Sequence, residues 1–101
     1  MAQGNVVMTV VLESTPEMLD ELNDWYDNEH IPALLAQDGW LSARRFRDAA
    51  NPNRLLAIYE LEDESTFAAT DFSQMAEERS AKIFSAVTLV DQTVWTATSD
   101  A

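Results

Sequence analysis

The first long apolar run of the chain constrains its fold most. Residues 5–12, NVVMTVVL, are apolar or β-branched at both odd and even positions. A strand with one solvated face alternates between apolar and polar residues, whereas a strand covered on both faces is a nearly continuous apolar run. The sequence therefore predicts a central strand here, with a layer packed on each side of its sheet.

A helix is expected after this strand. Ser14 and Thr15 precede Pro16, which is a helix-start pattern with proline near the first helical position. Apolar residues then recur at helical spacing, and acidic residues fall on the opposite side. Pro32 cannot donate to the helical ladder and disfavours helical geometry at the residue before it. This helix is therefore expected to end near residues 29–31.

Three more strands and a second helix complete the predicted pattern. Residues 40–47 (WLSARRFR) and 54–62 (RLLAIYELE) favour strands, and the turn-rich segment DAANPN between them fits a hairpin. Residues 65–82 are helical in composition, with an expected break near 70–73, and residues 92–98 (QTVWTAT) alternate as a last strand. The order is β-α-β-β-α-β, an α+β, ferredoxin-like arrangement in which a four-stranded antiparallel sheet carries its helices on one face.

The second face of this sheet also needs a cover. On the third predicted strand the odd-numbered residues from 55 to 61 are apolar and point one way, while Leu56 and Ile58 point the other way. The chain of 101 residues is expected to form one domain, residues 1–101, with no length for a second one. A second copy is the simplest cover, so we predict a homodimer whose two sheets close face to face.

Composition excludes several classes of function. The chain has six Lys and Arg against 18 Asp and Glu, and residues 1–43 contain no Lys or Arg. Such an acidic surface repels phosphate backbones, so no nucleic-acid partner is expected. The absence of cysteine and the single histidine leave no usual metal-ligand set. With no targeting segment and no apolar run long enough for a membrane, we expect a cytoplasmic protein that binds no membrane.

One segment carries a resemblance to a known superfamily. Residues 25–35, WYDNEHIPALL, are followed by GWLSARRFR. This pattern resembles the dimeric α+β barrel superfamily, and within it the EthD-like proteins, which carry a W-Y-D-x-E-H-x-P-like helix end before such a strand. The resemblance covers residues 5–62 and extends to the rest only in layout. The superfamily includes cofactor-free monooxygenases, polyketide cyclases, muconolactone-type isomerases, decarboxylases and haem-handling enzymes, so the resemblance implies a fold more firmly than a reaction.

His30, the single histidine, lies where the first helix is expected to end. Leu22, Tyr26 and His30 form an i, i+4, i+8 line on that helix. A helix C-terminus and the neighbouring Glu29 would both favour protonated His30. The residue could move a proton on a bound substrate, as histidine does near neutral pH, or it could donate to a free carbonyl and fix the turn at Pro32.

Aromatic residues and arginines complete the candidate site. An aromatic wall favours a flat, apolar or aromatic ligand, and a buried tyrosine hydroxyl needs a partner that a ligand oxygen could supply. Arg44 and Arg45 point to opposite faces of their strand, so one of them could hold a carboxylate or enolate oxygen, or pair with the acidic first helix. The predicted catalytic residues are His30, Tyr26 and Tyr59, and the predicted substrate-binding residues are Trp25, Glu29, Trp40, Arg44, Arg45, Phe46 and Trp95.

These features together favour a cofactor-independent enzyme with an aromatic or polyketide-like small molecule as its substrate. The reaction would be proton transfer of the cyclase, isomerase or lyase kind, with His30 as acid/base, Tyr59 or Tyr26 as hydroxyl partner and Arg44 or Arg45 as anion holder. No metal or other cofactor is predicted. The alternatives are a cofactor-free monooxygenase of the same superfamily, and a non-catalytic dimeric small-molecule-binding or accessory protein.

Overall fold

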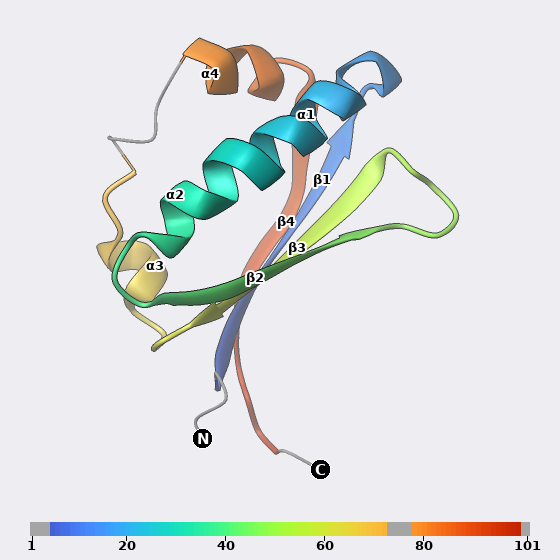
Figure 1. The fold of residues 1–101 in the computed structure, drawn as a ribbon. Coiled ribbons are helices and arrows are strands. Elements are labelled where there is room, and N and C mark those ends of the chain that lie inside the picture. Colours follow the sequence, from blue (N-terminus) through green and yellow to red (C-terminus); the bar gives the residue numbers. More distant parts are fainter. Residues whose placement is uncertain (1–4, 73–77, 100–101) are drawn as a thin grey trace.

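The computed structural model describes residues 5–72 and 78–99. The chain forms two layers, with the helices on one face of a sheet (Figure 1). A short 3₁₀ turn, Pro16–Met18, precedes the first helix, and a π-helical turn, Tyr26–His30, joins the first helix to the second. The other elements are β1 Val6–Ser14, α1 Leu19–Trp25, α2 Ile31–Leu35, β2 Trp40–Arg47, β3 Arg54–Leu61, α3 Thr66–Ala69, α4 Glu78–Phe84 and β4 Val87–Thr96.

The four strands form one antiparallel sheet in the order β2-β3-β1-β4. Val10 lies opposite Ala57 in the β1–β3 pair, and Ala43 lies opposite Tyr59 in the β2–β3 pair. The most apolar strand segments, β1 and β3, occupy the centre of the sheet, as their composition predicts. The predicted α+β, ferredoxin-like fold with helices on one face is confirmed.

Alternation along the strands divides the sheet into a helix-covered face and a second face. The helix-facing side chains of β3, from Leu55 to Leu61, are at most 6% exposed and form the core. The other face is only half-buried at its centre, and none of the described helices lies over it (Figure 1). We call this second face the open face; its side chains include Val7, Thr9, Val11, Arg44, Phe46, Leu56, Ile58 and Trp95.

The first and last strands differ in their bounds from the predicted ones, and one helix break is where it was expected. β1 extends to Ser14, and β4 begins at residue 87 rather than 92, because residues 87–91 pair with the end of β1 across a bulge. A bulge interrupts the alternation by which a strand is recognised in sequence. The expected helix break is seen at Thr70, whose backbone is extended, while residue 73 lies outside the described residues.

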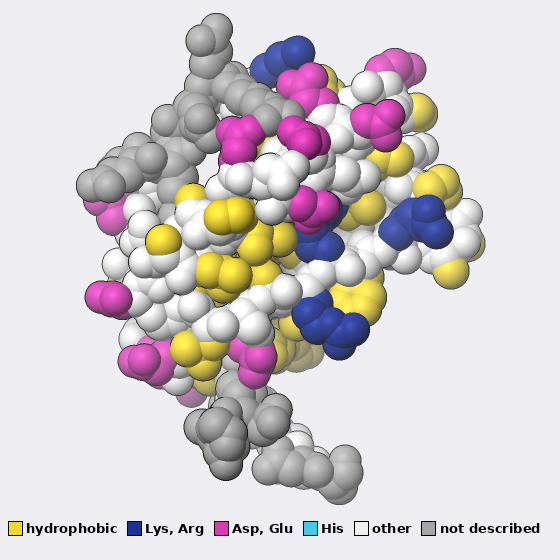
Figure 2. Space-filling model, in the orientation of Figure 1, with side chains coloured by type: hydrophobic (Ala, Val, Ile, Leu, Met, Phe, Trp, Pro, Cys, Tyr) yellow, Lys and Arg dark blue, Asp and Glu magenta, His cyan; other side chains and the backbone are white. Residues whose placement is uncertain are grey.

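Charged side chains lie on the outside of this architecture. Figure 2 shows acidic side chains spread over the helix layer, while arginine atoms gather beside β2 and the β2–β3 hairpin. In that hairpin the Asp48 carboxylate accepts hydrogen bonds from the backbone N–H groups of Ala50 and Asn51, at 2.8 and 3.2 Å. The turn-rich segment therefore forms the hairpin that it predicts.

Candidate functional site

The helix between β1 and β2 contains a widened turn beside the candidate residues. The backbone N–H of Ile31 donates to the carbonyl of Tyr26, five residues earlier, so this turn is π-helical. In an α-helix, residues five apart are separated by about 140° around the axis. Here the rings of Trp25 and His30 stack with centroids 4.4 Å apart and an interplanar angle of 16°. The widened turn, a feature often found at functional sites, therefore gathers these aromatic rings into one cluster.

The helix does not end near residues 29–31, which corrects the prediction made from Pro32. Ile31 keeps helical backbone angles of −63° and −47°, and α2 continues to Leu35. Proline inside a regular α-helix removes one hydrogen bond and crowds the carbonyl four residues earlier. The π turn changes the bonding pattern just before Pro32, which then lies in the first turn of α2, where its missing N–H costs little.

His30 is a half-buried, neutral side chain and not a cation at a helix end. Its ring packs against Trp25 and is perpendicular to the ring of Tyr26, with centroids 5.1 Å apart. Burial lowers the pKa of His30 from 6.5 to about 4, and no hydrogen bond from a described residue contributes to this change. The expectation that Glu29 and the helix end favour the protonated form is therefore wrong, because the helix continues and desolvation dominates.

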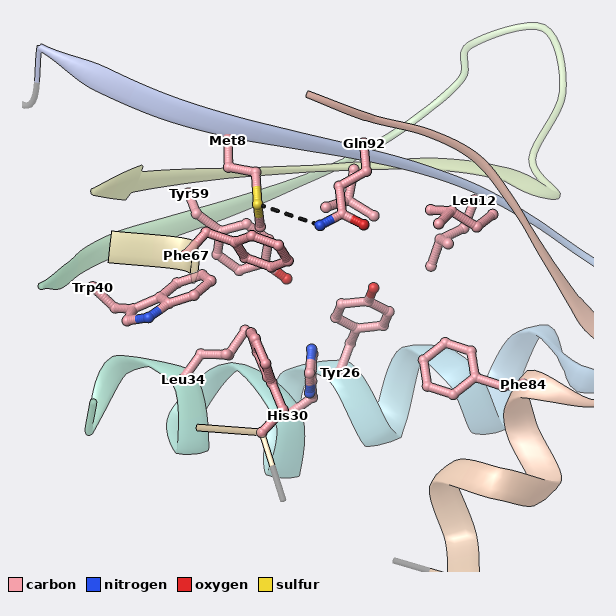
Figure 3. Close-up of a pocket in the computed structure, with 13 residues that line it drawn as sticks. Met8, Leu12, Tyr26, His30, Leu34, Trp40, Tyr59, Phe67, Phe84 and Gln92 are labelled. Carbon is pink, nitrogen blue, oxygen red and sulfur yellow. Dashed lines mark hydrogen bonds between the residues drawn. The ribbon is translucent and has the colours of Figure 1, made fainter. Parts of the chain in front are cut away.

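A cavity lies beside His30, between the helix layer and the sheet (Figure 3). Its volume is about 340 Å³, which is within the range of about 300–1,000 Å³ typical of small-molecule sites. The polar side chains on its wall are His30, Tyr26, Tyr59 and Gln92, and no charged side chain is among the described residues that line it. Most of the remaining wall is apolar, including Met8, Leu12, Leu34, Trp40, Phe67 and Phe84.

Tyr26 and Tyr59 direct two hydroxyl groups into the same space (Figure 3). Tyr26 belongs to the π turn, and Tyr59 to the middle of β3. Burial raises the pKa of Tyr26 to about 12, although the positive charge of Arg45 partly opposes this. Burial and the neighbouring Tyr26 raise the pKa of Tyr59 as well. Both tyrosines are therefore neutral near pH 7 and can donate hydrogen bonds to a ligand.

Trp40 closes the cavity on the side of α3. Its ring meets the ring of Tyr59 edge-on with centroids 5.3 Å apart, and its Nε1 donates to Thr70 Oγ1 at 2.8 Å. The preceding residue, Gly39, has a φ of +88°, and a Cβ at this position would lie 2.7 Å from Thr66 Cγ2. Glycine fits this conformation and this close approach, and it sets the direction in which β2 begins.

The predicted arginines lie on different faces of the sheet. Arg45 faces the helices, where its Nη1 lies 3.0 Å from an Asp27 carboxylate oxygen and its guanidinium lies 4.7 Å from the centroid of the Tyr26 ring. Arg44 is on the open face, with its guanidinium 4.9 Å from the ring centroid of Phe46. The alternative that an arginine pairs with the acidic first helix therefore holds for Arg45.

The predicted aromatic residues are also divided between the two faces. Trp40 and Tyr59 line the cavity, as the sequence suggests. Phe46 and Trp95 lie across the sheet from it, on the open face, where they are 38% and 53% exposed. Trp95 Nε1 donates there to Thr9 Oγ1 at 2.8 Å. The structure therefore does not bring Phe46, Trp95 or Arg44 together with His30 within one chain.

Trp25 and Glu29 lie behind the wall of the cavity. Trp25 is 2% exposed and does not line the cavity, but its ring stacks on His30 and meets the rings of Tyr26 and Phe84 edge-on. Its Nε1 has no hydrogen-bond partner among the described residues. Glu29 is half-buried on the same helix and does not line the cavity. Trp25 is therefore placed to orient His30 and not to contact a ligand directly.

Several wall residues are not found by sequence reasoning. Gln92 stands at the edge of the cavity and donates from Nε2 to the Met8 sulfur at 3.8 Å (Figure 3). Gln92 and Val94 are two residues apart on the last strand and therefore share a face. The apolar Val94 is a signal that could have placed Gln92 on the helix-facing side. Phe67 and Phe84 also line the cavity, but the short helices that carry them have no apolar periodicity from which their direction could be predicted.

Neither a cluster of metal-ligating side chains nor a membrane-spanning helix is found among the described residues. Within residues 5–72 and 78–99, no three His, Cys, Asp or Glu side chains are grouped so that they could hold a metal ion. Over the same part of the chain, no helix combines the length and the apolar character needed to cross a membrane.

Comparison with known proteins identifies the fold. No family model matches the sequence, and no curated protein matches it. A candidate antibiotic biosynthesis monooxygenase from Deinococcus radiodurans is 17% identical over 95% of each chain, with a TM-score of 0.74. Rv0793 from Mycobacterium tuberculosis is 17% identical over 95% of this chain and 97% of its own, with a TM-score of 0.74. SnoaB, a cofactor-independent oxygenase from Streptomyces nogalater, is 15% identical over 94% of each chain, with a TM-score of 0.63.

The chain has the fold of the antibiotic biosynthesis monooxygenases. The likeness extends to the fold alone, so membership of the dimeric α+β barrel superfamily stays a prediction. None of these structures is described as an EthD-like protein, so that finer assignment stays a prediction. At 15–17% identity the likeness concerns the fold, and the reaction has to be argued from the cavity.

Proposed function

We propose that this protein is a small-molecule oxygenase that acts, without an added cofactor, on a flat hydroxylated aromatic compound bound in the cavity. The observation that carries the proposal is the cavity wall, in which apolar and aromatic side chains surround one neutral histidine, two neutral tyrosines and one amide. Such a wall suits an apolar ring system with a few hydroxyl or carbonyl groups. The description of SnoaB as a cofactor-independent oxygenase supports this reaction over the alternatives.

In the proposed reaction the bound compound itself reduces dioxygen. A ring methylene group next to a hydroxylated ring loses a proton to solvent water, and the electron-rich carbanion transfers an electron to dioxygen. A carbon–oxygen bond then forms, a proton from water returns to the peroxide anion, and the resulting hydroperoxide loses water. One methylene group and one dioxygen molecule thus give one carbonyl group and one water molecule, so the carbon is oxidised and both methylene hydrogens leave in the water. Tyr26 and Tyr59 would donate hydrogen bonds to the ligand oxygen on which negative charge develops.

The protonation state of His30 decides which role this residue can have in the proposed reaction. A cyclase, isomerase or lyase that uses histidine as a general base works best when the pKa of that histidine is near the operating pH. Burial holds the pKa of His30 at about 4, which makes it a weak base but a good neutral hydrogen-bond partner for a ligand hydroxyl. This observation argues against His30 as the general base of any of these reactions, the oxygenase included, and supports a positioning role for His30.

The test of this proposal measures dioxygen consumption with a panel of hydroxylated anthrones and naphthols, and follows label from ¹⁸O-labelled dioxygen into the product. We expect turnover that stops under nitrogen and a product that carries one labelled oxygen atom. Tyr26→Phe should lower kcat/KM by about 100-fold, whereas Arg54→Met in the hairpin should not change it. Turnover without dioxygen would support the proton-transfer reactions instead, and binding without turnover would support a non-catalytic binding protein.

We also propose that a second copy of the chain covers the open face. The centre of this face carries half-buried aliphatic side chains such as Val11 and Ile58, and Phe46 and Trp95, on the two outer strands, remain 38% and 53% exposed. Exposed apolar side chains gathered on one face mark interaction surfaces. A second, identical sheet offers a surface of the same shape and chemistry, which is what a two-fold symmetric interface requires.

Sedimentation equilibrium across a dilution series tests the dimer. The unchanged chain should sediment with twice the mass of one protomer. Leu56→Asp should shift it towards the monomer, because its neighbours on the adjacent strands, Phe46 and Val11, are apolar and the new charge would be buried in the interface without a partner. Ala50→Asp adds the same charge at the exposed hairpin turn and should leave the dimer intact. A folded monomer at all concentrations of the unchanged chain would contradict the proposal.

A further inference from the structure

Arg45 is the most constrained cation among the described residues. Its Nη2 donates to Asn23 Oδ1 at 2.6 Å, and its Nη1 donates to Asp27 Oδ1 at 3.0 Å. Its side chain is only 15% exposed, whereas that of Asp27 is 60% exposed. The two contacts fix the planar guanidinium against the helix that carries Tyr26, 4.7 Å from the centroid of that ring.

The Tyr26 ring stands between Arg45 and the cavity. Tyr26 lines the main cavity, and it also lines a small gap that Arg45 shares with residues of β1 and β3. Arg45 itself is not among the residues that line the main cavity. A cation over an aromatic ring in a partly desolvated site is attracted by the π electrons of that ring, so Arg45 also holds the ring in place.

The other groups around Tyr26 carry no charge near neutral pH. His30 is on the same helix and is neutral, and Tyr59 faces Tyr26 from β3. From β1 and β4 the cavity wall contributes apolar side chains and the neutral amide of Gln92, and from α4 it contributes a phenylalanine. Asp27 lies beyond the guanidinium in solvent, where water screens its charge more strongly than that of Arg45. Arg45 is thus the charge that acts most directly on the Tyr26 hydroxyl in the described part of the chain.

We propose that Arg45 is a positioning residue that acts on the ligand through Tyr26. It fixes the ring from the side away from the cavity and polarises the phenolic O–H, so that Tyr26 becomes the stronger donor to a ligand oxygen that gains negative charge. The cavity then stabilises an enolate or phenolate oxygen without placing a cation on its own apolar wall. The inference rests on the proposed function, because it concerns the ligand oxygen of that reaction.

The first experiment follows Tyr26 itself and needs no ligand. The chain has two tyrosines, so incorporation of 3-fluorotyrosine gives two ¹⁹F resonances, which the Tyr59→Phe variant assigns. Fluorination lowers the pKa of the phenol, so the titration needs a less alkaline pH, and circular dichroism at each pH confirms that the chain is folded. Arg45→Met should raise the ionisation midpoint of Tyr26 by about one pH unit, and Arg45→Lys by less, since it keeps the charge but loses the planar contact.

Two controls keep this first experiment interpretable. Arg54→Met also removes an arginine and its ion pair, here with Asp48 in the hairpin, and should leave the Tyr26 midpoint unchanged. If Arg45→Met fails to fold, Arg45→Gln carries the same expectation, because its amide can still donate to Asn23. An unchanged Tyr26 midpoint in a folded Arg45→Met or Arg45→Gln variant would overturn the inference.

The second experiment connects Tyr26 to the ligand. The phenol 4-nitro-1-naphthol changes colour when it ionises, so absorbance reads its pKa while it is bound. Arg45→Met and Tyr26→Phe should each raise this bound pKa. The rise in the double variant should be smaller than the sum of the two single rises, because both substitutions act on one hydrogen bond. The inference would be overturned if the two single changes in the bound pKa were additive in the double variant, or if the bound pKa did not change in Arg45→Met. If the probe does not bind while the ¹⁹F midpoint still depends on Arg45, the proposed function fails and the contact between Arg45 and Tyr26 stands alone.

Discussion

Acidification should destabilise this protein through His30. Its pKa is about 4 in the folded chain, below the ordinary value of 6.5. Between these two pH values the unfolded chain binds a proton at His30 and the folded chain does not. The contribution of neutral His30 to the free energy of unfolding is therefore fully present above pH 6.5 and is lost as the pH falls towards 4. Each pH unit of difference corresponds to about 1.4 kcal/mol. Between about pH 7 and pH 5 the expected loss in the free energy of unfolding is about 2 kcal/mol.

A His30→Gln variant isolates this effect from the many carboxylates. The variant keeps every acidic residue but cannot take up the proton, so its urea unfolding at pH 7 and pH 5 provides the reference. The unchanged protein should lose about 2 kcal/mol more than the variant over this interval. Since the chain has one histidine, a ¹H NMR titration of the imidazole ring protons reports its pKa directly. A midpoint at or above the ordinary value of 6.5, or equal pH dependence of the two proteins, would refute the argument from burial.

Three further substitutions test the packing around the cavity. Gly39→Ala should cost about 2–4 kcal/mol in urea unfolding, from backbone strain and a clash with Thr66, and adding Thr66→Ala should recover only the clash. Trp40→Phe should lose the hydrogen bond to Thr70 and about 1 kcal/mol of unfolding free energy in the same assay, and ligand titration should show weaker binding. Leu22→Ala, at a side chain with no exposure, should cost about 2–5 kcal/mol in thermal unfolding.

The sheet could be predicted because successive side chains of a strand point to opposite faces, so a short stretch of sequence is enough to assign them. On β3, Leu55, Ala57 and Tyr59 point to the helices and are buried, whereas Leu56 and Ile58 point to the open face and are half-buried. This division follows directly from the two-residue period of a strand. The start of β4 could not be predicted in the same way, because its bulge opposite the end of β1 changes which residues share a face.

The candidate site was harder to predict because it depends on one irregular turn. The sequence rule for Pro32 assumes regular α-helical bonding, and the π turn before it invalidates that assumption. Through the same turn the helix continues beyond His30. His30 is therefore a neutral ring packed beside the cavity and not the expected cation at a helix end. Burial is a property of tertiary packing, and no spacing within residues 25–35 could distinguish these two environments. The position of His30 was therefore predictable, while its charge was not.

The choice between the two neighbouring arginines is made by the register of β2. A bulge just after Trp40 shifts its pairing with β3, and beyond this bulge Arg45 lies opposite Ala57. Ala57 is small, so its side of the sheet has room for a long side chain under the helix. A shift of one residue would exchange the faces and put Arg44 beside Tyr26 instead. The charge that acts on the cavity thus depends on a strand irregularity and a small residue on the neighbouring strand, which is why the sequence of the arginine pair alone could not identify the inward one.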